Sequence, residues 1–221
     1  IDWTLTPEEP AKADPWNSYF AARFAWDDQS AALSRSAGQI RAATDAKRVE
    51  APYYFEARSG DHKVAILTGG LPFHRRIGIG GKLDLMLAVR GETELRRRIG
   101  VGLNLEYPMH GALGLLAPPI VLSLNGPPAA GPTGWFFHLD RKNAMTTSLA
   151  PRGESFDAGF TARILETEGR AAKLNLRCLR APKAARLVDL NGRTLEELKV
   201  AGDAVELELK ANEWLQIEVD W

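Results

Sequence analysis

The sequence contains a single cysteine, Cys178, among its 221 residues. No internal disulfide can therefore form, and the cysteine content leaves the redox compartment and the localisation undetermined. No run of about 18 apolar residues occurs, so we expect no membrane-spanning helix. The sequence also lacks a starting methionine and a signal segment. Because it opens with Trp3 and Leu5 already alternating, we expect a piece of a longer protein.

The sequence has no excess of charge of either sign. Its 28 Lys and Arg residues balance 28 Asp and Glu residues, which gives a formal net charge of zero. Proteins that bind nucleic acid or a membrane surface through bulk charge need a positive excess. We therefore expect neither nucleic acid nor a membrane as a partner.

Motifs for metal binding and catalysis are also missing. The four histidines stand at positions 62, 74, 110 and 138, too far apart for a local metal site, so we expect no cofactor in this chain. Gly78–Lys82 resembles part of a phosphate-binding loop. It does not match that loop, because Arg76 stands where the first glycine is required and Leu83 stands where a serine or threonine is required. No Gly-x-Ser-x-Gly elbow occurs. Carboxylates are plentiful, yet no pair can be assigned to one site.

What the sequence does contain is alternation of apolar and polar residues with period two. This pattern predicts strands that bury one face against a core and expose the other. The predicted core positions are Leu83, Leu85, Leu87 and Val89; Ile99, Val101, Leu103 and Leu105; Leu174, Leu176 and Cys178; Val205, Leu207 and Leu209; and Leu215, Ile217, Val219 and Trp221.

Turn residues separate these strands at short intervals. Asn191-Gly192 predicts a hairpin with a type I′ turn, and Gly202-Asp203 and Ala211-Asn212 predict two later turns. We therefore predict an all-β protein with a large antiparallel, supersandwich-like β-sandwich over residues 1–130 and a smaller β-sandwich over residues 131–221. The boundary lies in a tract rich in proline and glycine.

Helical signals are weak. The segment Gln29–Lys47 is rich in alanine, but it lacks a full apolar stripe and contains Gly38. A surface helix and a long loop both remain open for this segment.

One candidate binding feature is the aromatic segment Trp16–Trp26. On a single strand, Trp16, Phe20, Phe24 and Trp26 would share one face and Tyr19 would lie on the other. Aromatic rings beside polar groups could stack against a sugar, and the structural alternative is that the even-numbered face is core.

A second candidate is the segment Leu71-Pro-Phe-His-Arg-Arg-Ile77, which lies between two predicted strands and is flanked by glycines. We expect an exposed turn or hairpin there. His74, Arg75 and Arg76 could bind a hydroxyl-rich or anionic ligand, or the arginines could pair with acids of a neighbouring segment.

Four segments resemble the C-terminal β region of glycoside hydrolase family 38 α-mannosidases. Trp16–Trp26 is similar to the strand that enters the large β domain of the family. Val64–Arg76 followed by Lys82–Arg90 is similar to its long hairpin region. Pro108-Met-His110 resembles a connector, and Ala184–Trp221 resembles the closing sandwich.

The resemblance implies a non-catalytic role for this chain. In the family, the zinc ion and the nucleophilic aspartate belong to an N-terminal α/β domain, and no segment here resembles that domain. The implied partner is an upstream catalytic domain of the same protein, which this chain would scaffold. Carbohydrate could contact Trp16, Tyr19, Trp26, His74, Arg75 and Arg76 at the outer part of the sugar site. Likeness of fold alone does not establish a function.

Two other functions remain open. The chain could be a free-standing carbohydrate-binding module, or a small enzyme whose paired carboxylates come from distant segments. Both are compatible with an all-β fold, and the resemblance favours the scaffolding role.

Overall fold

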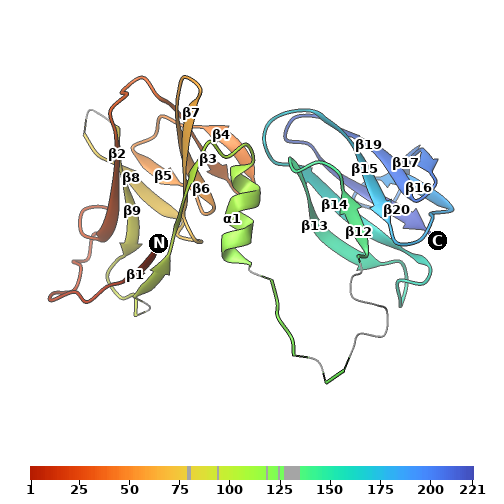
Figure 1. The fold of residues 1–221 in the computed structure, drawn as a ribbon, viewed down its shortest axis with the longest axis horizontal. Coiled ribbons are helices and arrows are strands. Elements are labelled where there is room, and N and C mark those ends of the chain that lie inside the picture. The colour runs from red at the N-terminus through yellow and green to blue at the C-terminus, as the bar shows by residue number, and fades with distance from the viewer. Residues whose placement is uncertain (79–80, 94, 118, 124, 127–134) are drawn as a thin grey trace. The chain divides into compact units, whose positions relative to one another are not determined.

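A computed structural model describes the chain except residues 79–80, 94, 118, 124 and 127–134 (Figure 1). It divides into two compact units, Ile1–Pro119 and Ile120–Trp221. Strands dominate both units, every strand pair in the described part is antiparallel, and a single short helix occurs there. The predicted all-β class is confirmed. The predicted boundary near residue 130 falls within 127–134, outside the described residues, and stays a prediction.

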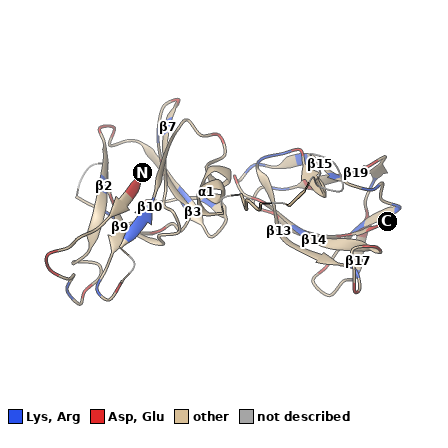
Figure 2. Ribbon diagram, turned by 60° about the horizontal axis from the view of Figure 1, so that its bottom comes forward, with Lys and Arg blue, Asp and Glu red and all other residues tan. Residues whose placement is uncertain are grey.

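Unit 1 contains two sheets and a short two-stranded ribbon. The first sheet has the order β11 (Gly100–Leu103), β7 (His62–Leu67), β6 (Tyr54–Ser59), β3 (Ala32–Ala37), β4 (Ile40–Ala43). The second has the order β2 (Phe20–Trp26), β9 (Gly81–Ala88), β8 (Phe73–Arg76), β5 (Arg48–Glu50). In the ribbon, β1 (Asp2–Thr4) pairs with β10 (Arg96–Arg98), which stands out in blue in Figure 2, and Arg98 forms an ion pair with Asp2 at 2.6 Å.

Both sheets of unit 1 contribute to one core. Leu83, Leu85 and Leu87 of β9 meet Phe55 of β6 and Ile66 of β7, and all five side chains are buried. Burial of each such side chain contributes roughly 1.5–3 kcal/mol. A core shared by two sheets is what the predicted sandwich requires.

The segment Gln29–Lys47 forms neither the surface helix nor the long loop that the sequence left open. It forms the hairpin β3–β4, whose turn is made by Gly38 with a φ of +56°. Its one fully buried side chain is polar: the Ser36 hydroxyl accepts hydrogen bonds from the backbone N–H groups of Tyr53 and Tyr54, and Leu33 is only partly buried against the core. A strand with so little apolar surface lacks the alternating pattern by which strands are identified.

One further expectation for unit 1 is wrong, and one segment has more structure than expected. Pro108-Met-His110, expected as a connector toward the next domain, begins helix α1 (Pro108–Leu116), which has proline in its first turn and packs against β6, β7 and β11. The strand predicted from Ile99 to Leu105 is shorter, and only Ile99 is buried in the core. Because β11 is an edge strand, Val101 and Leu103 are 45% and 72% exposed.

Unit 2 also has two sheets. One has the order β12 (Phe137–Leu139), β15 (Ala172–Cys178), β19 (Ala204–Leu209), β18 (Val200–Ala201). The other has the order β13 (Ala144–Pro151), β14 (Gly159–Glu166), β20 (Trp214–Asp220), β16 (Ala184–Val188), β17 (Thr194–Glu197).

The alternating residues of unit 2 are buried as predicted. The predicted core positions on β15, on β19 and on β20 from Leu215 to Val219 all belong to one cluster with Phe160 and Ile164 of β14. The predicted hairpin between β16 and β17 is present, but its turn is not type I′, because Gly192 has a positive φ and Asn191 does not. Instead, the Asp189 carboxylate accepts hydrogen bonds from two backbone N–H groups of the turn.

A buried carboxylate organises the end of β14. Glu166 is fully buried and accepts five hydrogen bonds of 2.8–3.1 Å, from the side-chain amide of Asn143 and from the backbone N–H groups of Glu168, Gly169, Arg170 and Asn212. Oε1 accepts two of these bonds and Oε2 accepts three. The carboxylate therefore holds the β14–β15 loop and the β19–β20 turn together.

Candidate functional site

Four charged side chains form a row across the second sheet of unit 1. Arg23 on β2 is opposite Asp84 on β9, Asp84 is opposite Arg75 on β8, and Arg75 is opposite Arg48 on β5. Residues directly opposite each other share a sheet face. The side chains that alternate with this row face the core: Ala22 and Phe24 on β2, Leu83 and Leu85 on β9, and Val49 on β5. We therefore call the other side of the sheet, which carries the row, the outer face.

Asp84 is the centre of this row and is almost completely buried. Arg23 donates to both of its oxygens, from Nε to Oδ1 at 2.6 Å and from Nη2 to Oδ2 at 2.8 Å, and the Tyr19 hydroxyl donates to Oδ2 at 2.8 Å. These bonds, Arg23 first, lower the pKa of Asp84 below its ordinary value although burial opposes them. Burial, together with this bond, raises the pKa of Tyr19. Near neutral pH the carboxylate is therefore ionised and the phenol protonated.

A turn before β2 lies over the row. Arg75 Nη1 donates to the carbonyl oxygen of Trp16 at 2.5 Å and to Asn17 Oδ1 at 3.2 Å. The Arg48 guanidinium lies 4.9 Å from the centroid of the Trp16 ring, and Phe73 contacts that ring edge to face at 6.0 Å. The two arginines therefore hold Trp16 in place.

Two hollows flank the row. The apolar hollow, of about 450 Å³, is lined by Pro15, Trp16, Leu71, Pro72, Phe73, Met86, Ala88, Val89 and Glu92. The basic hollow, of about 500 Å³, is lined by Lys47, Arg48, Arg75, Arg76, Ile77 and Gly78. Trp16 lines the first and stacks on Arg48 of the second, so the hollows are neighbours. An apolar wall beside clustered cations suits a ligand with an organic body and an anionic group.

The structure brings together four of the six residues that the sequence suggested for carbohydrate contact. Trp16, Tyr19, Arg75 and Arg76 lie at the row and its hollows. Trp16 precedes β2 in a turn, so the expectation of one strand from Trp16 to Trp26 is wrong. Trp26 packs against Phe55 at 6.1 Å between ring centroids, with the core.

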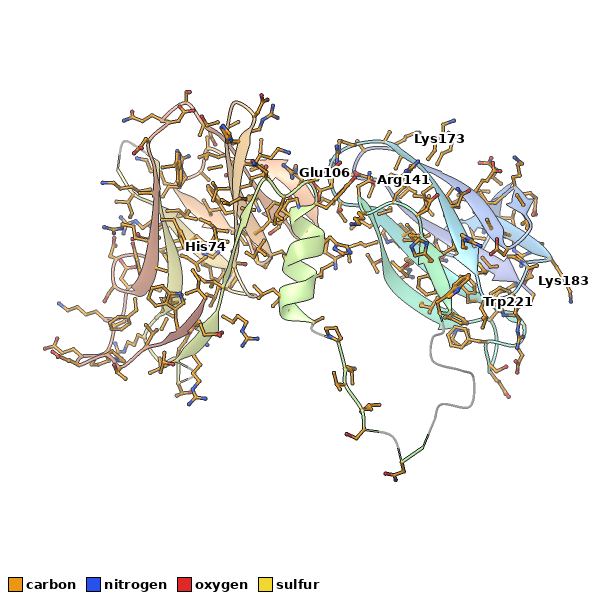
Figure 3. All side chains as sticks on the ribbon, in the orientation of Figure 1. His74, Glu106, Arg141, Lys173, Lys183 and Trp221 are labelled. Carbon is orange, nitrogen blue, oxygen red and sulfur yellow. The ribbon has the colours of Figure 1, made fainter. Side chains whose placement is uncertain are left out.

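His74 lies inside unit 1 and not at the row (Figure 3). The segment expected to be an exposed turn is strand β8, paired on both sides, and alternation along it points His74 into the core. Its Nε2 lies 3.1 Å from the carbonyl oxygen of Ala51, and burial lowers the pKa of the imidazole to about 4. No surface of His74 is left for a ligand.

Sequence reasoning missed Lys47, Arg48 and Asp84. Asp84 has a recognisable signal, because it is a carboxylate inside an otherwise apolar strand, Leu83–Leu87. Such a residue needs a cationic partner, and Arg23 supplies it. Lys47 and Arg48 follow a segment whose structure the sequence did not indicate, so nothing connected them with Arg75.

Arg23→Ala is expected to lower the free energy of unfolding of unit 1, because it leaves the buried Asp84 carboxylate without its bidentate partner. The effect is below that of a fully buried pair, since the Arg23 side chain is 58% exposed. Urea denaturation of Arg23→Ala, Asp84→Asn and the double variant measures the coupling. If the loss of stability in the double variant equals the sum of the losses in the two single variants, Arg23 and Asp84 are not coupled.

The described residues contain neither a group of metal ligands nor a membrane-spanning helix. No three His, Cys, Asp or Glu side chains there are grouped as metal ligands would be. No helix in the same residues is long and apolar enough to cross a membrane.

The fold has known counterparts, although no protein-family model and no curated protein match the sequence. A crystal structure of a glycosyl hydrolase family 38 protein from Enterococcus faecalis matches 88% of the chain with a TM-score of 0.64 and 11% identity. An α-mannosidase from Enterococcus faecalis V583 matches 90% with a TM-score of 0.66 and 10% identity. In each case the match covers 25% of the larger chain. This chain therefore has the fold of a region that makes up about a quarter of such proteins.

Proposed function

We propose that this chain is the non-catalytic C-terminal β portion of an α-mannosidase-like glycoside hydrolase, where it scaffolds an upstream catalytic domain. The observation that carries the proposal is the extent of the structural match. It spans 88–90% of this chain, which includes most of both units, but only 25% of each matched chain. A chance similarity between two common β-sandwich domains would be expected to cover one unit of this chain and not both.

The row on unit 1 fits a supporting role better than a catalytic one. Its carboxylate, Asp84, is engaged by Arg23 and Tyr19 and is buried. A nucleophile or a general acid has to reach the substrate, and a pair of carboxylates is usual in glycoside hydrolysis. In this role the zinc ion would belong to the upstream domain.

The proposal predicts that catalysis requires the parent protein. The full-length gene product is expected to hydrolyse an aryl α-mannoside with zinc present, whereas the purified 221 residues are expected to give no hydrolysis. Removal of this region from the parent is expected to lower kcat/KM by about tenfold or more, because misplaced catalytic groups lose rate steeply. Hydrolysis by the 221 residues alone would overturn the proposal. An unchanged kcat/KM of the parent protein after removal of this region would also overturn it.

A carbohydrate-binding module is the second candidate, favoured by one observation. The Trp16 ring borders the apolar hollow and is only partly buried, as a platform for a sugar ring has to be. This candidate requires binding of a neutral sugar by the chain alone. Titration of the purified chain with a neutral sugar distinguishes this candidate from scaffolding, because only a carbohydrate-binding module should bind the sugar and lose that binding in Trp16→Ala.

A further inference from the structure

The basic hollow concentrates cations that have no anionic partner in the described part of unit 1. Lys47, Arg48, Arg75 and Arg76 come from β5, β8 and the segment before β5. Among the described residues, no carboxylate oxygen lies within 4.0 Å of a side-chain nitrogen of any of the four. The chain as a whole has no net charge, so this is a local excess.

Neutral groups position these cations without cancelling their charge. Arg75 donates to the carbonyl oxygen of Trp16 and Arg76 Nη1 donates to that of Asp45 at 2.8 Å. In addition, Arg48 and Arg75 are directly opposite across two strands, and like charges in that position destabilise a sheet. The sheet tolerates this repulsion, so the two positive charges stay close together at the basic hollow.

Two nearby acids are already engaged. Asp84 accepts from Arg23 and Tyr19, and the Asp14 carboxylate accepts from the side chain of Asn17 and from the backbone N–H of Trp16 at 2.9 Å. Hydrogen bonds make the largest contribution to the lowered pKa values of Asp14 and Asp84, and Arg48 and Arg75, respectively, lower them further through charge attraction without an ion pair. Neither carboxylate forms an ion pair with the cations of the hollow.

We propose that the basic hollow binds a phosphate ester whose organic body lies toward Trp16. Guanidinium groups present paired N–H donors that match the oxygens of a phosphate, and the Lys47 ammonium group adds further donors. The Trp16 ring and the adjoining apolar hollow offer a surface for the body of the ligand, such as a hexose. This site is independent of the scaffolding proposal, because it needs no other domain.

The test is an NMR titration of the purified chain with three probes: glucose 6-phosphate, inorganic phosphate and neutral glucose, at constant ionic strength set with chloride. Both phosphates are expected to shift the Nε–Hε signals of Arg48 and Arg75, and glucose is expected to leave them unchanged. Tighter binding of glucose 6-phosphate than of phosphate supports the proposed ester site. Equal binding would overturn the contact of the organic body with Trp16 and would identify a site for free phosphate instead.

Variants separate this site from general attraction of anions. Lys47→Gln/Arg48→Gln is expected to weaken glucose 6-phosphate binding by about tenfold, which corresponds to about 1.4 kcal/mol. Arg58→Gln is the matched control, because Arg58 is opposite Lys63 in the other sheet and forms another like-charged pair. Lys47→Gln alone, at an exposed position, keeps the test informative if the double variant folds poorly. Equal binding by neutral glucose, or unchanged affinity in the variants, would overturn the proposal.

Discussion

Glu166→Ala is expected to lower the free energy of unfolding of unit 2 by at least about 3 kcal/mol. The substitution removes the acceptor of four backbone N–H groups and one side-chain amide, and each buried donor left without a partner costs about 1–3 kcal/mol. Water entering the space offsets only part of the loss, because the site is fully buried. Urea denaturation monitored by amide signals of unit 2 provides the measurement.

Glu166→Gln sharpens this test because it keeps the size of the side chain. Whichever oxygen becomes the amide nitrogen, at least two N–H donors then face another donor. We expect this variant to lose about 2 kcal/mol or more. Glu208→Gln on β19 is the matched control, since its side chain is 73% exposed, and it should change stability by less than about 0.5 kcal/mol. Equal effects at the two positions would contradict the role of Glu166.

The second large effect is a dependence of the stability of unit 1 on pH through His74. In the unfolded chain this histidine takes up a proton near pH 6.5, whereas in the folded protein it does so only near pH 4. Between these values the unfolded state binds more protons, so the free energy of unfolding falls as the pH falls. At about 1.4 kcal/mol per pH unit, the loss from His74 reaches about 3 kcal/mol at the lower end.

Substitution isolates this contribution from that of the carboxylates. His74→Gln can keep an N–H donor for the Ala51 carbonyl but cannot titrate, so its stability should decline less than that of the original protein between pH 6.5 and pH 4. His62→Gln, on the exposed end of β7, should keep the original pH dependence. Denaturant curves at several pH values, followed on unit 1, measure the difference. Parallel curves for His74→Gln and the original protein would exclude His74 as the source.

Strands that bury a single apolar face could be predicted from sequence alone. The core positions of β15 and β19 alternate strictly, because one face meets the core and the other meets water. The hairpin β3–β4 could not be predicted in this way, because its one fully buried side chain is the polar Ser36 and Leu33 is only partly buried against the core. Helix α1 was missed for a related reason, since its mixture of proline, glycine and leucine has no clear period.

The candidate site depends on register, which the sequence does not reveal. Arg23, Arg48, Asp84 and Arg75 are separated by up to 61 residues and become neighbours only because four strands align in one order. Tyr19, Arg75 and Arg76 were suggested by residue type alone. Their partners could be found only once the strand order was known.

The chain's single thiol can report on the opening of unit 2. Cys178 is buried in the core of that unit, and burial raises its pKa to about 11. Thiol reagents attack the thiolate, so the folded protein should resist labelling, and modification should occur only when β15 separates from its neighbours. Because unit 1 contains no cysteine, the labelling rate would time the opening of one half of the chain without interference from the other.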